Sequence, residues 1–102
     1  MDRVLQLLSL AQRAGKVASG EFKTEEAVKS YQASLVVVAG DASDNTKKKF
    51  TNMCTFYEVP ILFYSDKESL GHFIGKEFRA SLAVTDKGLA DKILSESSNQ
   101  SN

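Results

Sequence analysis

The chain has 102 residues, with 13 Lys and Arg balanced by 13 Asp and Glu, a hydrophobic fraction of 42% and a charged fraction of 25%. A chain of this size is one domain that can bury a core without disulfides or metals, and its average composition excludes a disordered protein. No apolar run approaches the roughly 20 residues needed to span a bilayer, and the zero net charge argues against a strongly basic nucleic-acid protein.

Helices and strands are predicted to alternate along the first half of the chain. Helical spacing relates Val4, Leu7, Leu8 and Ala11, and Gly15 is well placed to end that helix. Residues 16–19 (KVAS) fit a short strand. The segment 21–32 (EFKTEEAVKSYQ) predicts a second helix that buries Ala27, Val28 and Tyr31. Residues 34–40 (SLVVVAG) form a continuous β-branched run, which is typical of a strand buried on both faces.

The second half continues the alternation. Residues 43–59 predict an amphipathic helix with Phe50, Met53, Cys54 and Tyr57 inward, and residues 60–65 (PILFYS) a strand. The next helix is expected to begin with Ser65 and Glu68 in capping-box spacing, and its apolar stripe contains Leu70, Phe73 and Ile74. A buried strand at 81–86 (SLAVTD) then precedes a helix with Leu89, Ile93 and Leu94 inward. This pattern predicts an α/β domain over residues 1–94 with helices on both sheet faces, followed by a flexible polar tail at 95–102.

Few residues support an enzyme. The only histidine, His72, lies beside an apolar stripe and is interpreted as structural, and Cys54 belongs to an apolar helix face, so it is interpreted as a small buried hydrophobe. Asp41 follows a buried strand, where a receiver domain places its phosphorylated aspartate, but the expected acidic pair after the first strand is missing. No phosphate-loop or dinucleotide pattern occurs. We expect no catalysis, cofactor or metal, and the N-terminus lacks a signal-peptide layout, so we expect a cytosolic protein.

Three clusters near helix and strand ends suggest anion binding. Lys47, Lys48 and Lys49 follow the cap candidates Ser43 and Asp44, where a helix N-terminus attracts anions and disfavours cations. They fit either a solvated helix face or a phosphate site shared with free backbone N–H groups. The second cluster is GEFK at 20–23, in which Phe22 either packs inward or offers a flat face to an unstacked base. The third is GKEFRA at 75–80, with Phe78 and Arg79.

These stretches resemble the L7Ae/L30e superfamily of ribosomal proteins, and most closely its small bacterial ribosomal-protein-like branch. The resemblance rests on LLSLAQRAGKVASGEFKTEEAVK, SLVVVAGDASDNTKKK and VPILFYSDKESLGHFIGKEFRASLAV, in this order and spacing. It implies a three-layer α/β/α sandwich with a four-stranded mixed sheet and about five helices. It also implies binding to kink-turns or related internal loops of RNA through the second helix start, the loop after the second strand and the loop before the last strand.

The resemblance also assigns individual residues. Ser43, Lys47 and Lys67 match a pocket for a flipped-out nucleotide, and Lys76 to Arg79 match the loop that covers it. Kink-turn readers carry asparagine, glutamate and lysine where this chain has Phe22, Lys23 and Glu26, so the reading of the RNA is expected to be altered. The expected RNA-binding residues are Gly20, Glu21, Phe22, Lys23, Glu26, Ser43, Lys47, Lys48, Lys67, Lys76, Phe78 and Arg79.

The sequence therefore predicts a non-enzymatic protein that binds structured RNA, with ribosomal RNA as the expected partner and with association with the ribosome as a further expectation. Lys47, Lys67 and Lys76 are expected to hold the RNA backbone, and Phe22 and Arg79 to offer stacking or base-edge contacts. No membrane or small-molecule substrate is expected. The alternative is a protein-interaction module that keeps the fold without binding RNA; zero net charge and the three replaced reader residues favour it.

Overall fold

The fold is known from a computed structural model, which describes residues 2–100. Helices and strands alternate, as the sequence pattern predicts. The elements are α1 (Arg3–Arg13), β1 (Val17–Ser19), α2 (Glu21–Lys29), β2 (Leu35–Val38), α3 (Asp44–Tyr57), β3 (Ile61–Phe63), α4 (Lys67–Phe73), β4 (Ser81–Val84) and α5 (Lys87–Gln100). Within this part of the chain, none of the helices has the length and apolar character to cross a membrane.

The strands form one mixed sheet in the order β1-β4-β2-β3. Strand β4 is antiparallel to both β1 and β2, while β2 and β3 are parallel. The register pairs Val36 with Ala83 across β2 and β4, and Val36 with Ile61 across β2 and β3. Every residue of the two central strands β2 and β4 is buried, because helices cover both faces of the sheet.

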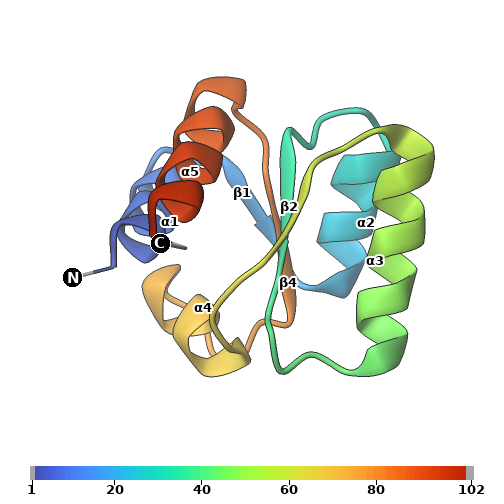
Figure 1. Cartoon of the computed structure of the whole chain (residues 1–102), viewed down its shortest axis with the longest axis horizontal. Coiled ribbons are helices and arrows are strands. Elements are labelled where there is room, and N and C mark those ends of the chain that lie inside the picture. Colours follow the sequence, from blue (N-terminus) through green and yellow to red (C-terminus); the bar gives the residue numbers. More distant parts are fainter. Residues whose placement is uncertain (1, 101–102) are drawn as a thin grey trace.

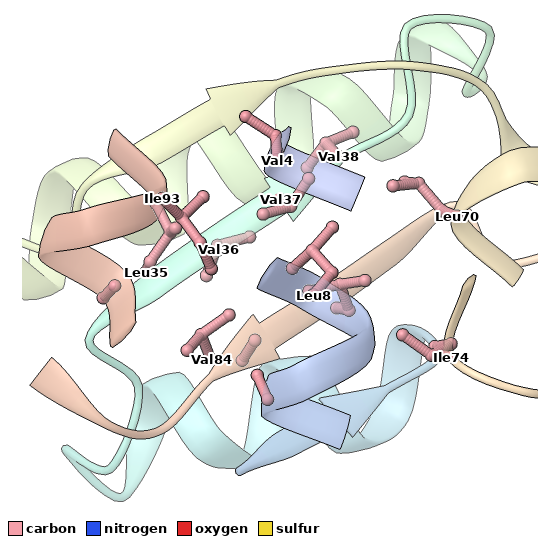
Figure 2. Packing of buried hydrophobic residues seen from close by; sticks show 14 of the residues in the cluster. Val4, Leu8, Leu35, Val36, Val37, Val38, Leu70, Ile74, Val84 and Ile93 are labelled. Carbon is pink, nitrogen blue, oxygen red and sulfur yellow. The ribbon is translucent and has the colours of Figure 1, made fainter. Parts of the chain in front are cut away.

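Figure 1 shows the three layers, with α2 and α3 on one face of the sheet and α1, α4 and α5 on the other. This confirms the expected three-layer α/β/α sandwich with a four-stranded mixed sheet and five helices. Figure 2 shows one half of the core, where Val4 and Leu8 of α1, Leu70 and Ile74 near α4, and Ile93 of α5 pack around Leu35–Val38 of β2. On the opposite face, Phe50 and Cys54 of α3 are buried, and so are Ala27 and Val28 of α2.

Two predicted local features differ from the structure. Tyr31 is 78% exposed instead of buried, because α2 ends at Lys29 and Tyr31 then adopts a left-handed conformation with φ 63°. The predicted capping box starting at Ser65 is also wrong. Ser65 has φ 59°, and Asp66 caps α4 instead, its carboxylate accepting a hydrogen bond from the backbone N–H of Ser69 at 2.7 Å.

The polar end of the chain is helical as far as the structure describes it. Helix α5 continues to Gln100, and the flexibility expected for residues 95–102 stays a prediction. The side chain of Ser97 donates a hydrogen bond to the carbonyl of Leu94 at 2.9 Å, and Glu96 lies 3.9 Å from Arg3. Residues 101 and 102 of the predicted tail lie outside the described residues, and the domain boundary at residue 94 stays a prediction.

Gly71 gives a test of how α4 packs on the loop that follows it. A Cβ atom at this position would lie 1.4 Å from the carbonyl oxygen of Glu77, which is backbone and cannot move aside cheaply. We expect Gly71→Ala to lower the free energy of unfolding by about 1–3 kcal/mol, or by more where the loop must shift, in a denaturant titration.

Gly88→Ala in α5 is the matched control. The nearest atom to its new Cβ would be a side-chain oxygen of Asp86 at 3.4 Å, which is an ordinary contact. Because alanine favours a helix over glycine by about 1 kcal/mol, this variant is expected to be neutral or more stable. Equal stability of the two variants would contradict the close packing of Gly71.

Candidate nucleic-acid interface

The predicted RNA-binding residues gather at one end of the sheet. Strands β1, β2 and β3 run in the same direction and β4 runs oppositely, so three strand ends and the start of β4 meet there. The connections at this end are 19–21, 39–43, 64–66 and 74–80, and helices α2, α3 and α4 all begin from it (the lower end in Figure 1). We call these connections, with the first turns of the three helices, the loop end of the sheet.

Hydrogen bonds tie the connections of the loop end together. The backbone N–H of Arg79 donates to the carbonyl of Lys67 at 3.0 Å, and the Arg79 Nε donates to the hydroxyl of Ser19 at 3.3 Å. The backbone N–H of Lys67 in turn donates to a carboxylate oxygen of Asp41 at 2.9 Å. The Gly40 N–H donates to the Ser65 carbonyl at 2.8 Å, so the loops at the ends of all four strands share one bonded framework.

The start of α2 is open to solvent. Gly20 has φ 94°, a conformation that glycine adopts without strain, and its N–H donates to the Ser81 carbonyl at 2.9 Å. No side chain caps this helix, so its first N–H groups remain available to an external acceptor. Phe22 is 76% exposed, which decides between the two alternatives left open for it: its ring does not pack into the core.

The three lysines near the start of α3 have different surroundings. The hydroxyl of Ser43 caps the helix by accepting the Thr46 N–H at 3.1 Å. Lys47 is half-buried, and Lys48 is exposed. Lys49 instead turns toward α2, where its Nζ lies 2.9 Å from a carboxylate oxygen of Glu21 and 2.7 Å from one of Glu25. Of the three lysines, Lys49 is therefore the one that is held by carboxylates of the neighbouring helix.

The connection between α4 and β4 places the remaining predicted residues. Phe78 is 66% exposed, so it is not tucked beneath the loop, and Lys76 is exposed beside it. Together with Glu68, His72 and Glu77, these two side chains line a hollow of about 260 Å³. The Arg79 Nη1 donates a hydrogen bond to the carbonyl of Phe78 at 2.9 Å, which restrains the guanidinium beside this loop.

The loop end carries both acidic and basic side chains, and these two groups differ in whether they have partners. Several carboxylates are engaged: Asp41 and Asp66 accept backbone N–H groups, and Glu21 pairs with Lys49. At the loop end, the cations that form no ion pair with another described residue are Lys23, Lys47, Lys48, Lys67, Lys76 and Arg79. A neutral protein thereby presents free positive charge next to helix N-termini, although Glu26, Glu68 and Glu77 lie nearby.

Cys54, His72 and Asp41 have different surroundings. Cys54 is buried, and burial raises the pKa of its thiol to about 11, which leaves it protonated and unreactive. His72 is exposed and its ring contacts Phe73 edge-on at 5.4 Å between centroids. Asp41 uses its carboxylate to hold the Lys67 N–H. No group of three potential metal ligands occurs among residues 2–99.

The sequence did not reveal the contacts of Asp41 and Lys49. Both act on residues far along the chain, Lys67 and Glu21, and such pairs leave no local spacing signal. The ion pair of Glu25 with Lys29, by contrast, has the i,i+4 spacing of a helix and was open to prediction.

The chain belongs to the ribosomal protein L7Ae/L30e/S12e/Gadd45 family, whose model matches residues 2–94. It is similar to a Bacillus subtilis (strain 168) protein named RNA-binding protein YlxQ, with 46% identity over 87% of this chain and 89% of the relative. An Enterococcus faecium protein of the same name is 38% identical over 89% of this chain and 87% of the relative.

Solved structures agree with this family fold. A protein of unknown function from Bacillus halodurans C superposes with a TM-score of 0.91 at 34% identity, covering 94% of this chain and 97% of the other. The Giardia lamblia 15.5kD RNA binding protein superposes with a TM-score of 0.78 at 19% identity, covering 93% and 82%, and shares the fold. The suspected L7Ae/L30e membership is thus confirmed.

The ion pairs of Glu25 make a pH prediction. Hydrogen bonds from Lys29, and then from Lys49, lower the pKa of Glu25 from 4.5 to about 2. Because the folded-state pKa lies below the ordinary value, this pairing stabilises the protein above about pH 4.5 and is lost as the pH falls toward 2. We expect an NMR titration of the Glu25 carboxyl carbon to show a midpoint near 2, and Lys29→Met to raise it. A midpoint near 4.5 in the unmodified protein would contradict both ion pairs.

Proposed function

We propose that the protein binds structured RNA through the loop end of the sheet. The observation that carries this proposal is the juxtaposition of an uncapped helix start, the exposed ring of Phe22 and lysines without ion pairs at one end of the molecule. Helix N-termini and free lysines attract phosphates, and an exposed aromatic ring offers a stacking surface to an unpaired base. The two bacterial relatives carry the name RNA-binding protein, which supports the same partner.

Each element of the loop end has a separate role in this proposal. The free N–H groups at the start of α2, with Lys47 and Lys48 of α3, receive backbone phosphates. Phe22 and Phe78 stack on bases that leave the helix of the RNA. Arg79 is held by Ser19 and Phe78, so its guanidinium is preorganised for a phosphate or a base edge. In this proposal the protein binds and positions RNA and catalyses no reaction.

The proposed specificity is an internal loop of ribosomal RNA that differs from a standard kink-turn. Phe22 has no hydrogen-bonding group, Lys23 donates without accepting, and Glu26 carries negative charge, so these three positions cannot read sheared G·A pairs as kink-turn readers do. The proposed setting is the cytosol, in association with the ribosome.

A mobility-shift assay with three RNAs tests the proposal. The probes are a kink-turn duplex, a simple stem-loop and total ribosomal RNA, each at low and at moderate salt. We expect binding to ribosomal RNA in preference to the other two. Equal binding to the kink-turn duplex would refute the altered specificity, and binding to none of them at low salt would refute RNA binding itself.

A protein-interaction module is the second candidate. Tyr31 and Phe56 are each 78% exposed, and both rings contact Tyr57, with centroids at 5.5 and 4.9 Å. This aromatic cluster precedes β2 and β3, so it lies at the end of the sheet opposite the loop end. Such an exposed cluster favours protein binding, and the absence of any RNA shift would make it the leading candidate.

The lysines of α3 provide the next prediction. Lys47→Ala combined with Lys48→Ala is expected to weaken binding to ribosomal RNA, because two phosphate contacts are removed. If each lysine neutralises one phosphate, the slope of log K against log salt should fall by about one to two units. Binding measured at four salt concentrations gives this slope.

Lys87→Ala combined with Lys92→Ala is the charge-matched control. These lysines lie on α5, which starts at the opposite end of the sheet. The control should keep a slope close to that of the unmodified protein. An unchanged slope in the α3 variant, or an equal fall in the control, would contradict the assignment of Lys47 and Lys48.

A further inference from the structure

Lys49 differs from the two lysines before it in what it contacts. Its Nζ lies 2.9 Å from Glu21 and 2.7 Å from Glu25, so it bridges two carboxylates one turn apart on α2. The hydrogen bonds that Lys49 donates to those carboxylates, to Glu25 first, raise the pKa of Lys49. Glu25 has a second cation, Lys29, at 2.6 Å, whereas Lys49 is the cation that pairs with Glu21 among the described residues.

The place of Glu21 makes this pairing important. Glu21 is the first residue of α2, between Gly20 and the exposed Phe22, and its side chain is 59% exposed. A carboxylate suits a helix N-terminus electrostatically, but it also repels a phosphate that approaches the same N–H groups. Without Lys49, the first turn of α2 would carry an uncompensated negative charge beside the proposed RNA.

We propose that Lys49 is a positioning residue for RNA binding, which neutralises Glu21 and ties the start of α2 to α3 without contacting the RNA. This inference rests on the proposed function and concerns the same site. Lys47 and Lys48 bind phosphates, and Lys49 reduces the repulsion between Glu21 and a phosphate at the start of α2. The three consecutive lysines therefore divide into two functions.

The geometry explains why Lys49 does not act as a third phosphate ligand. Its side chain is 36% exposed and reaches from α3 to α2, and its Nζ lies 5.8 Å from the centroid of the Phe50 ring. Turning toward a phosphate would break two bonds shorter than 3 Å and would leave Glu21 without a cation, whereas Glu25 would keep Lys29. Exposed ion pairs stabilise a fold only weakly, so this arrangement matters more to the electrostatics of the site than to folding.

A charge-balanced rescue tests the inference. The probe is labelled, fragmented total ribosomal RNA, and its affinity is measured for the full chain by filter binding. Lys49→Met is expected to lower the affinity about fivefold, because one unmasked carboxylate then faces phosphate at short range. Lys49→Met combined with Glu21→Gln should return the affinity to within about twofold of the unmodified protein, since net charge is restored and Glu25 keeps Lys29.

Two controls separate positioning from direct contact. Lys48→Met is expected to weaken binding, and adding Glu21→Gln to it should not restore the affinity, because Lys48 does not mask Glu21. The melting temperature of Lys49→Met should stay within a few degrees of the unmodified protein, which shows that the variant is folded.

Each outcome has a defined consequence. If Lys49→Met with Glu21→Gln stays as weak as Lys49→Met alone, Lys49 contacts the RNA and the inference is wrong. If Glu21→Gln rescues Lys48→Met equally well, the effect is one of overall charge, and the inference is also wrong. If the unmodified protein does not bind ribosomal RNA, the proposed function itself fails, and that result is recognised before any variant is compared.

Discussion

Burial of β2 and β4 in the middle of the sheet is the constraint on which the loop end depends. Both strands are covered on their two faces, so their register is fixed by side chains that cannot turn to solvent. The order β1-β4-β2-β3, with only β4 reversed, then brings three helix starts to one end. The hydrogen bonds of Arg79 to Lys67 and Ser19 join neighbouring connections, and the exposed residues are thereby presented on a rigid base.

The electrostatics of the loop end follow from how its carboxylates are engaged. Asp41 and Asp66 bind backbone N–H groups, and Lys49 neutralises Glu21, so structural contacts offset much of the negative charge. Lysines of the same region lack such partners among the described residues. Net charge is consequently a poor guide to the partner of this protein, because a chain with zero formal charge can display one face suited to phosphate.

Local sequence patterns predicted most of the fold, because amphipathic helices and buried strands can be recognised from the spacing of their apolar residues. The run around Val36–Val38 and the face of Phe50 and Cys54 are examples. The burial of Tyr31 and the capping role of Ser65 were predicted wrongly because both residues adopt a left-handed conformation. Tyr31 follows the end of α2 and Ser65 precedes α4, and the apolar pattern does not reveal this backbone conformation. The RNA-binding assignments came partly from residue chemistry, as for Phe22 and Lys47, and partly from the family resemblance, as for Ser43 and Lys67. They stay predictions, although these residues lie at one end of the sheet. The pairing of Lys49 with Glu21 spans 28 positions and became visible only in three dimensions.

Hydrogen–deuterium exchange of the protein with and without ribosomal RNA is the most direct test of the account. If the loop end binds RNA, amide exchange should slow in segments 19–24, 43–48 and 75–80. Exchange should be unchanged around Tyr31 and Phe56, which lie at the opposite end of the sheet. Slowing confined to the segments around Tyr31 and Phe56, with none at the loop end, would contradict the account.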